Sequence, residues 1–369
     1  MRIYFSILIF LVTQMAEARL QRFGFDGVRQ SGMGNTGIAL ADDANTLWYN
    51  PAGLADVSGI HVNLFDFVVG ADSTDTLTRL NNAFFKSDFQ NLIRPDKEFL
   101  RFGINPQVVL PFFSFSLYEN LQGYFDLGNI KEMDFNKDVQ AVGFNDLGAI
   151  AGFAIPFGEY FSLGASARVF QRTGIESYLT TAEFINQAGV SGNVDEITSN
   201  LYQYMKNMAG AGVGVGTNAG ALFKIPLRGK DAPTVKFGAT VDDIGNTSFT
   251  KLGDVVGAPA SIRQSVNLGA AIQWKPKKGL TWNNELNYRD ALEQSDYLRH
   301  VHFGSELRWS WLGIRGGVSQ GYATFGFSLE TPPHTRIHFS TYGVEVGNKA
   351  MEKQHRWYLV QLIIGFNPF

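Results

Sequence analysis

Arg168, Phe170 and Arg172 are the residues whose types and spacing most favour binding chemistry. They follow the segment 161–169, in which odd positions are apolar and even positions are small or polar. Alternate side chains of a β-strand share one face, so both arginines and Phe170 are expected on the inner face. An inward arginine beside aromatic rings can hold a carboxylate head group while an apolar tail packs nearby. Each arginine can instead pair with an interior Asp or Glu, and the sequence leaves both interpretations open.

Other reactive side chains form no recognisable site. The histidines have neither zinc-ligand spacing nor an evident nucleophile beside them; they are His61, His300, His302, His334, His338 and His355. The glycine-rich run 32–37 lacks the preceding strand of a dinucleotide-binding loop. Asp42–Asp43 and Asp242–Asp243 are interpreted as hydrated turn carboxylates rather than a cation site. We therefore predict no catalytic residue, no metal site and no cofactor, and we do not expect an enzyme.

The remaining polar and glycine-rich patterns are assigned to a strand wall. His300 and His302 alternate on one strand face with Glu306 and Arg308, which indicates a polar inner wall. The glycines of the run 210–216 predict a strand whose small face packs against an interior segment.

The first residues predict an exported protein. Arg2 precedes an apolar run at 3–12 that is too short to cross a bilayer, and Ala16-Glu17-Ala18 has the small-x-small pattern of a cleavage site. Residues 1–18 are therefore expected to be a signal peptide, with Arg19 the first mature residue.

Composition favours membrane strands over membrane helices. After the signal peptide, no apolar stretch approaches the roughly 20 residues that a membrane helix needs. Mean hydropathy is -0.06, with 14% aromatics and 40 glycines, as alternating strands with one lipid face and one wet face would give. Net charge is -3 and there are no cysteines, so neither a nucleic-acid partner nor a disulfide framework is expected.

Periodicity completes the fold prediction. Segments such as 261–274 alternate with period two and are separated by short polar turns, which is typical of transmembrane β-barrels. We predict an all-β, antiparallel barrel of about fourteen strands over residues 59–369. The predicted strands are 59–70, 105–118, 121–130, 138–155, 160–173, 210–226, 234–247, 260–275, 279–289, 299–310, 311–319, 321–331, 334–344 and 354–367.

Two insertions and the last residue add to this prediction. Helical spacing of apolar residues near 75–100 and 178–208 predicts extracellular insertions. Phe369 ends an alternating strand with an aromatic residue, which is the signal expected for the barrel-assembly machinery.

Residues 31–54 carry a family resemblance. The glycine-rich stretch Ser31-Gly32-Met33-Gly34-Asn35-Thr36-Gly37 leads to Asn50-Pro51-Ala52-Gly53-Leu54. This pattern resembles the N-terminal hatch of FadL-type transporters of hydrophobic compounds, a superfamily that includes PorV/PorQ-like barrels. The phrases 235–247 and 342–347 are similar to the PorV-like branch. The resemblance implies a fourteen-stranded barrel with a hatch at residues 19–58 inside the lumen, carrying the motif Asn50, Pro51, Ala52 and Gly53.

The predicted function follows from the barrel and the resemblance together. We expect passive uptake of hydrophobic or amphipathic small molecules, such as long-chain fatty acids, across the outer membrane of a Gram-negative-type bacterium. Expected partners are outer-membrane lipid, the hydrophobic ligand and the assembly machinery. The alternative is a PorV-like interaction protein that holds a secretion substrate or another protein partner at the cell surface.

Overall fold

The computed structural model describes most of the barrel and the segment inside it. The described residues are 25–76, 78–79, 82, 97–126, 138–180, 186, 209–229, 231–253, 257–293, 296–331, 335–347 and 349–366. The predicted signal peptide, most of the two predicted insertions and Phe369 lie outside them.

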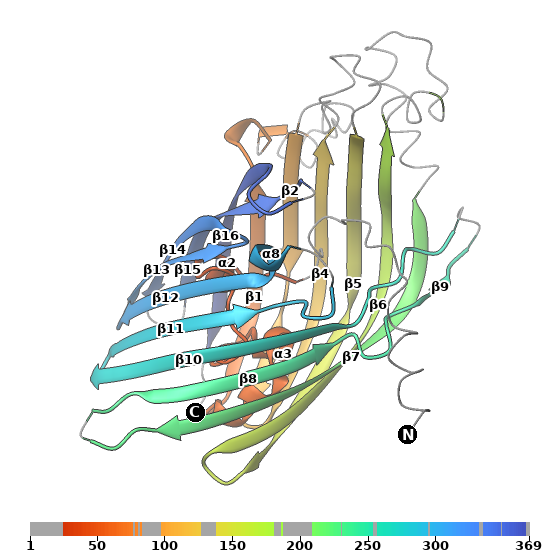
Figure 1. The fold of residues 1–369 in the computed structure, drawn as a ribbon. Helices are drawn as coiled ribbons and strands as arrows, with labels where there is room; N and C mark the ends of the chain where they lie inside the picture. Colours follow the sequence, from red (N-terminus) through yellow and green to blue (C-terminus); the bar gives the residue numbers. More distant parts are fainter. Residues whose placement is uncertain are drawn as a thin grey trace, which may run out of the picture.

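The wall is one antiparallel sheet of sixteen strands (Figure 1). The strands are β1 (His61–Ala71), β2 (Lys97–Ile104), β3 (Gln107–Leu110), β4 (Phe113–Asp126), β5 (Asp138–Phe157), β6 (Phe161–Thr180), β7 (Gly210–Pro226), β8 (Thr234–Asp242), β9 (Phe249–Lys251), β10 (Ser265–Lys277), β11 (Leu280–Tyr288), β12 (Val301–Trp309), β13 (Leu312–Ser319), β14 (Tyr322–Thr331), β15 (Thr335–Glu345) and β16 (Gln354–Phe366). A short helix, α8 (Tyr297–His300), precedes β12.

The sheet closes on itself because β16 pairs with β1 as well as with β15. β2 and β3 both lie between β1 and β4, so they share one position in the ring, and β9 pairs with β7 off the ring. Fourteen strand positions therefore surround the lumen, which confirms the predicted strand number and fold class.

The second and third predicted strands were placed wrongly. The wall strand begins at Lys97, inside the predicted insertion 75–100, and its ladder breaks at Pro106, which has no N–H to donate. The next turn is at Pro111-Phe112, where Phe112 has φ 67°. β4 then continues unbroken through the predicted gap at 119–120, because Asn120 alternates inward with its neighbours.

The ends of three later strands also differ from the prediction. β6 continues to Thr180 and not to 173, past the predicted start of the insertion at 178. β8 stops at Asp242 and not at 247, because Asp243 and Asn246 take left-handed backbone conformations, with φ 51° and 66°. β10 begins at Ser265 and not at 260.

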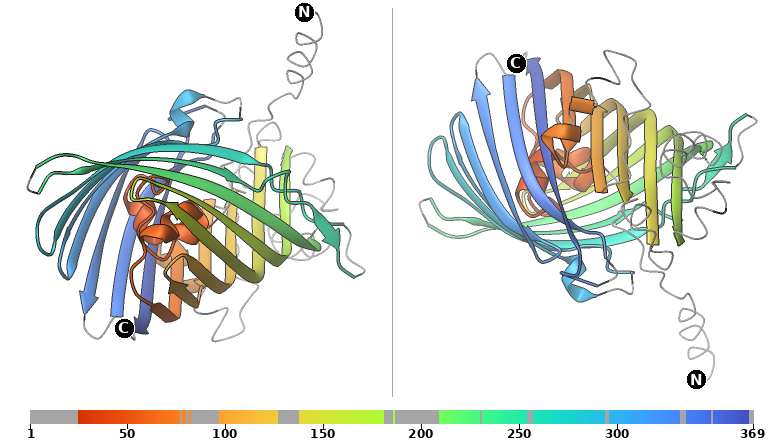
Figure 2. Two further views of the ribbon diagram at one scale, coloured as in Figure 1. Left: turned by 90° about the horizontal axis from the view of Figure 1, so that it is seen from below. Right: turned by 90° about the horizontal axis from the view of Figure 1, so that it is seen from above.

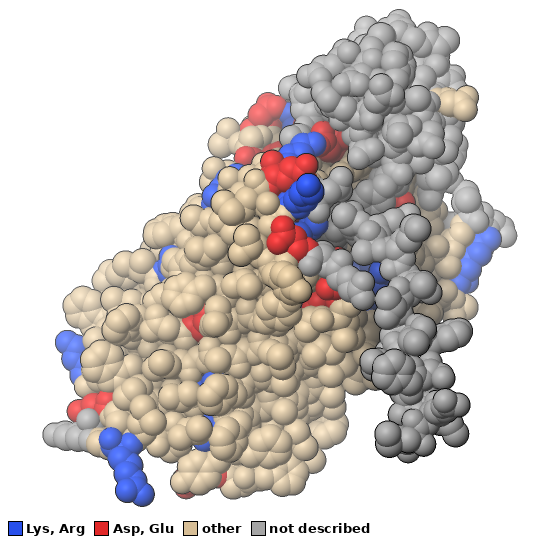
Figure 3. All heavy atoms as spheres, in the orientation of Figure 1, with Lys and Arg blue, Asp and Glu red and all other residues tan. Residues whose placement is uncertain are grey.

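The outer face of the wall is apolar. On β6, Leu163 and Val169 are 42% and 50% exposed, whereas Phe170 is 2% exposed, so the strand alternates as predicted. Tan surface without charge covers most of the front face in Figure 3. Among the described residues, no helix has the length and apolar character needed to cross a membrane. A closed barrel with such a face confirms the predicted outer-membrane location.

Residues 25–58, the N-terminal segment, lie inside the ring of strands (Figure 2). The segment holds three short helices, α2 (Val28–Gly32), α3 (Thr46–Tyr49) and the 3-10 helix η1 (Pro51–Asp56). α2 packs against β14 and β15, and η1 packs against β5, β6 and β7. Irregular backbone at membrane depth is tolerated here because protein, not lipid, surrounds it.

Part of the lumen is filled by an apolar cluster centred on Trp357. The Trp357 ring stacks on Phe99 with 3.7 Å between centroids, and Tyr342 meets the same indole edge-on at 5.6 Å. Val28 of the N-terminal segment belongs to this cluster. The other members are Val68, Tyr124, Val142, Val344, Val346 and Leu359, all at most 4% exposed.

Candidate functional site in the barrel lumen

The two predicted arginines face the lumen and are both ion-paired. Arg168 Nη2 lies 2.6 Å from Asp243 Oδ1. Arg172 donates two hydrogen bonds to Asp146, from Nε to Oδ1 at 2.7 Å and from Nη2 to Oδ2 at 2.6 Å. The structure thus places a carboxylate beside each guanidinium, as in the ion-pair interpretation of these residues.

Phe170 lies between the two arginines, and aromatic rings surround all three residues. The Arg168 guanidinium is 5.0 Å from the centroid of Phe170, and Arg172 is 4.2 Å from the centroid of Phe144. Phe249, brought in by β9, meets Phe170 edge-on at 5.4 Å. The site therefore combines paired charges with flat apolar surfaces.

These arginines line a cavity between the N-terminal segment and the wall, with a volume of about 110 Å³. Charged and polar side chains outnumber apolar ones in its lining. The segment contributes Phe25, Asp26, Asn35 and Trp48; the wall and its connections contribute Tyr118, Asn120, Asp146, Arg168, Arg172, Asn218, Asp242, Asp243, Ile262, Ser265, Arg289, Asp290, Arg299, His302 and Gln320.

Two buried donors at this cavity lack an acceptor among the described residues. They are the Nε atom of Arg168 and the indole Nε1 of Trp48. A buried N–H without a partner costs about 1–3 kcal/mol, so an oxygen atom that reached either donor would be stabilised. The chemistry available here is recognition of a hydrogen-bond acceptor next to aromatic rings.

Several lining residues escaped the sequence analysis. Tyr118 and Asp146 lie on inward positions of β4 and β5, and a correct assignment of β4 would have identified Tyr118. The interpretation of Asp243 as a hydrated turn carboxylate is wrong. Asp243 is 4% exposed and accepts bonds from Arg168 and, at 2.6 Å, from Thr247. Asp243 lies in a turn outside the strand, so strand alternation does not predict that its side chain points inward.

Asn50 fixes the start of η1. Its side-chain oxygen accepts from the Ala52 backbone N–H at 3.1 Å, and its amide donates to the Ile38 carbonyl at 2.7 Å and to the Ala221 carbonyl of β7 at 3.1 Å. Pro51 occupies the first helical position, where its missing N–H costs nothing. The motif thus ties the N-terminal segment both to itself and to the wall.

Glycines let the N-terminal segment approach the wall closely. A Cβ on Gly164 would lie 2.3 Å from the Ala52 nitrogen, and one on Gly220 would lie 2.1 Å from Asn50 Oδ1. Gly238 and Gly304 have the same relation to the carbonyls of Ile38 and Met33, at 2.3 and 2.2 Å. Any side chain at these positions would displace the segment.

The glycine run at the start of β7 does not serve this purpose. Gly210, Gly212 and Gly214 face residues of 247–259, and Gly216 faces Arg168, Asp243 and Thr247. The prediction that this run packs against the interior segment is therefore wrong, and Gly220 is the β7 glycine that touches it.

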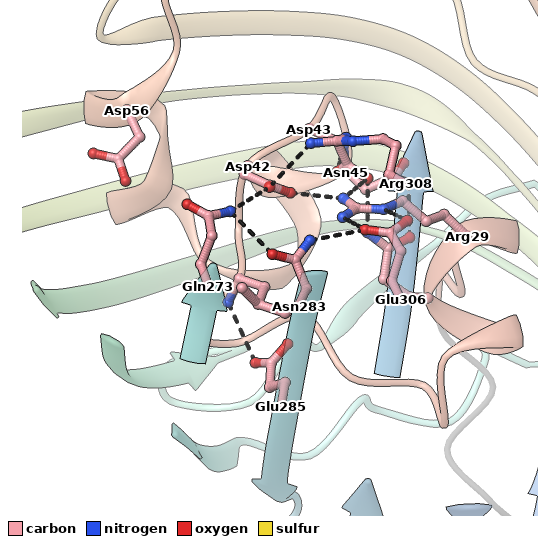
Figure 4. A network of polar contacts seen from close by, with 12 residues as sticks. Arg29, Asp42, Asp43, Asn45, Asp56, Gln273, Asn283, Glu285, Glu306 and Arg308 are labelled. Atoms are coloured by element: carbon pink, nitrogen blue, oxygen red, sulfur yellow. Dashed lines mark hydrogen bonds and ion pairs between the residues drawn. The ribbon is translucent and has the colours of Figure 1, made fainter. Parts of the chain in front are cut away.

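A buried charge network joins the N-terminal segment to the wall (Figure 4). Arg29 of α2 reaches Glu306 of β12 with bonds of 2.9 and 2.5 Å, and reaches Asp42 and Asp43 at 2.7 and 2.8 Å. Arg315 of β13 also donates to Glu306, at 2.7 Å. Glu306 is thus held by one arginine from the segment and one from the wall.

Amides and a second glutamate extend the network. Gln273 donates to Asp42 at 3.2 Å, and Asn283 donates to Glu306 at 2.9 Å. Glu285 accepts the Ala39 backbone N–H at 2.6 Å. Burial would raise the pKa of the Asp42 carboxyl, but the positive charges of Arg29, Arg308 and Lys236 together outweigh burial and the pKa is lowered. The sequence indicated a polar wall at Glu306 but gave no sign of its partner Arg29. The interpretation of Asp42 and Asp43 as hydrated turn carboxylates is wrong, because both are ion-paired with Arg29 inside the barrel.

The fold is similar to that of a solved hydrocarbon channel. A TodX deltaS2S3 mutant monoaromatic hydrocarbon channel aligns with a TM-score of 0.53 at 14% identity, covering 93% of this chain and 99% of that one. The CymD monoaromatic hydrocarbon channel has a TM-score of 0.46 at 14% identity, over 95% of this chain and 99% of that chain. A FadL homologue of Pseudomonas aeruginosa has a TM-score of 0.39 at 10% identity, with 95% and 100% coverage.

Sequence comparison adds nothing to this likeness, since no protein-family model and no curated protein matches the chain. At such low identity the alignment shows the fold alone. The fourteen-stranded barrel that the FadL-type resemblance implied is thus confirmed as a fold.

Proposed function

We propose that this barrel carries out passive uptake of amphipathic small molecules, with an apolar body and a hydrogen-bonding head, across the outer membrane. The observation that carries the proposal is the lumenal cavity with two unpartnered donors, Arg168 Nε and Trp48 Nε1, among aromatic rings. A carboxylate or other oxygen acceptor would bond to these donors, while Phe170 and Tyr118 would contact the apolar body.

The likeness in fold supports the transport class, because the aligned proteins are described as hydrocarbon channels. Long-chain fatty acids fit the same chemistry, with the carboxylate at Arg168. In this proposal the N-terminal segment is a hatch: it closes the lumen beside the cavity, and its movement releases the ligand toward the cell interior.

Identification of bound ligands tests this proposal directly. The mature protein would be extracted in mild detergent and its small-molecule content analysed by mass spectrometry, with an Arg168→Ala variant as the comparison. A fatty acid or related amphiphile retained by the unaltered protein and lost from the variant supports uptake. Equal recovery from both proteins would refute the assignment of Arg168.

The charged lining favours a second candidate, the PorV-like partner-holding role. Asp146 and Asp243 already neutralise the two arginines, as expected of a structural lumen wall. In that case the barrel would bind no amphiphile and would instead co-purify with a protein at its extracellular loops. Uptake requires the N-terminal segment to move, whereas holding a partner does not, and a reversible tether on the segment distinguishes the two roles.

A further inference from the structure

The outer wall carries an apolar groove of about 610 Å³ across β7, β8, β10 and β11. Small outward side chains, Ala221, Ala239 and Ala270, lie among much larger ones, and this difference in size creates the hollow. The larger residues are Phe223, Phe237, Leu268 and Leu286, which are 43–52% exposed. The groove faces away from the lumen, so it is separate from the cavity at Arg168.

A basic cluster lies at the short-turn end of the same strands. The last residues of β10 and the turn after it carry Lys275, Lys277 and Lys278, and the turn after β7 carries Arg228; all four are exposed. The Trp274 indole donates to the Asp231 carbonyl at 2.8 Å, which holds the two turns together. Basic side chains stand out at the lower left end of Figure 3, where these short turns lie.

Two indoles mark the membrane boundary at this end. The rings of Trp274 and Trp282 lie 6.1 Å apart on the outer face, the position of an aromatic girdle. Short turns belong to the periplasmic side of such barrels, so the lysines lie at the head groups of the inner leaflet. Lysines near a membrane surface attract anionic lipids.

The distance between the groove and the basic cluster fits within the thickness of one leaflet. Phe223 is three positions from Pro226, where β7 ends, and three strand residues span roughly 10 Å. Half of the hydrocarbon core is roughly 15 Å thick. A molecule with its head group at the lysines would therefore place its chains in the groove.

We propose that this groove and the basic cluster form a binding site for an anionic glycerophospholipid of the periplasmic leaflet. The acyl chains fill the hollow over Ala239 and Ala270, and the phosphate lies among Lys275, Lys277 and Lys278. The site does not depend on the transport role, because none of these residues touches the lumenal cavity.

Native mass spectrometry of the full mature protein tests the site. The protein would be reconstituted in nanodiscs with equal phosphatidylglycerol and phosphatidylethanolamine, then released at low ionic strength. We expect phosphatidylglycerol to be retained preferentially. The triple variant K275Q/K277Q/K278Q should lose that preference by roughly fivefold for each charge removed.

A second variant tests the groove itself. Filling the hollow with A239F/A270L should lower retention of both lipids, whereas A167L, at an exposed outward position of β6 outside the groove, should leave retention unchanged. The unheated gel mobility of each variant reports that the barrel has folded.

Three results would overturn the proposal. They are equal retention of the two lipids by the unaltered protein, an unchanged preference in the lysine variant, and a protein dimer that A239F/A270L dissociates. The last would make the groove an interface between two copies of this chain.

Discussion

The two sides of the lumen differ in how their inward side chains use space. Around Trp357 the interior is apolar and closely packed, with ten residues at most 4% exposed. Around Arg168 it is charged and leaves a cavity of about 110 Å³. Apolar side chains of many shapes can interdigitate until no space remains, whereas ion pairs hold fixed geometries and leave space between them. In this barrel the space for a ligand is therefore on the polar side.

Between these two sides lies the N-terminal segment, which contacts each of them differently. Val28 enters the apolar cluster, and Trp48 lines the cavity at Arg168. Arg29 joins the segment to the wall separately, through the charge network with Glu306. Stability of the barrel and retention of the segment should therefore respond to different substitutions.

The largest effect is expected for Glu306→Gln, which leaves Arg29 and Arg315 facing each other without their shared carboxylate. Removing one member of a buried ion pair costs about 3–5 kcal/mol, and two arginines place this case toward the upper end. We expect residues 25–58 to become accessible to protease, measured by limited digestion of the folded barrel. The matched control is Glu330→Gln, an exposed residue at a strand end; equal protease sensitivity of the two variants would show that the network does not retain the segment.

Trp357→Ala tests the apolar side. Truncating a fully buried tryptophan costs about 3–5 kcal/mol, so the free energy of unfolding of the barrel should fall by that amount in a urea titration. Affinity for an amphipathic ligand should stay unchanged, because Trp357 does not line the cavity. A large loss of affinity with little loss of stability would show that the Trp357 cluster binds the ligand and does not mainly stabilise the barrel.

Arg168→Ala and Arg172→Ala separate the two arginines of the polar side. Loss of a charge-assisted hydrogen bond should weaken fatty-acid binding by about 1.5–3 kcal/mol in the Arg168 variant. The effect of Arg172→Ala should be smaller, because two donors of Arg172 already bond to Asp146. Both barrels should fold; unchanged affinity in both variants, measured by calorimetry, would leave these arginines as ordinary lumenal ion pairs.

Phe170→Leu should produce the smallest change. It removes the aromatic face 5.0 Å from the Arg168 guanidinium, an interaction worth about 0.5–1 kcal/mol at such sites. The loss should appear in ligand affinity and be absent from Phe153→Leu, an outward residue that is 51% exposed. Equal affinities of the two variants would show that the aromatic surface near Arg168 does not contribute to binding.

The sequence predicted what strand alternation and turn residues can encode. The period-two pattern of 161–169 placed Phe170 and both arginines on the inner face, and the strand count followed from the same periodicity. Long-range contacts leave no such local pattern. The pairing of Arg29 with Glu306 joins residues 277 positions apart, and Asp243 reaches the cavity from a left-handed turn.

Local sequence patterns gave a wrong prediction where the same pattern is compatible with two structures. Helical spacing of apolar residues over 75–100 predicts an insertion there, although β2 begins at Lys97. The predicted strand 105–118 runs through Pro106, where the ladder in fact breaks. The glycine run 210–216 correctly indicated close packing but not its partners, which lie mainly at 243–250 and 257–259.

Movement of the N-terminal segment is the central claim, and a reversible tether between that segment and the wall tests it. A Cβ on Gly32 would lie 3.2 Å from the Ser340 Cβ, a few tenths of an ångström below disulfide spacing, and the chain has no native cysteine. The double variant G32C/S340C would be compared with each single variant, which controls for the tight fit of a side chain at Gly32.

Uptake of a labelled fatty acid would be measured with this tether oxidised and then reduced. The account predicts that uptake stops in the oxidised double variant and returns on reduction, with unheated gel mobility unchanged throughout. Uptake that is the same in both states would contradict it, because the segment would then be a static plug.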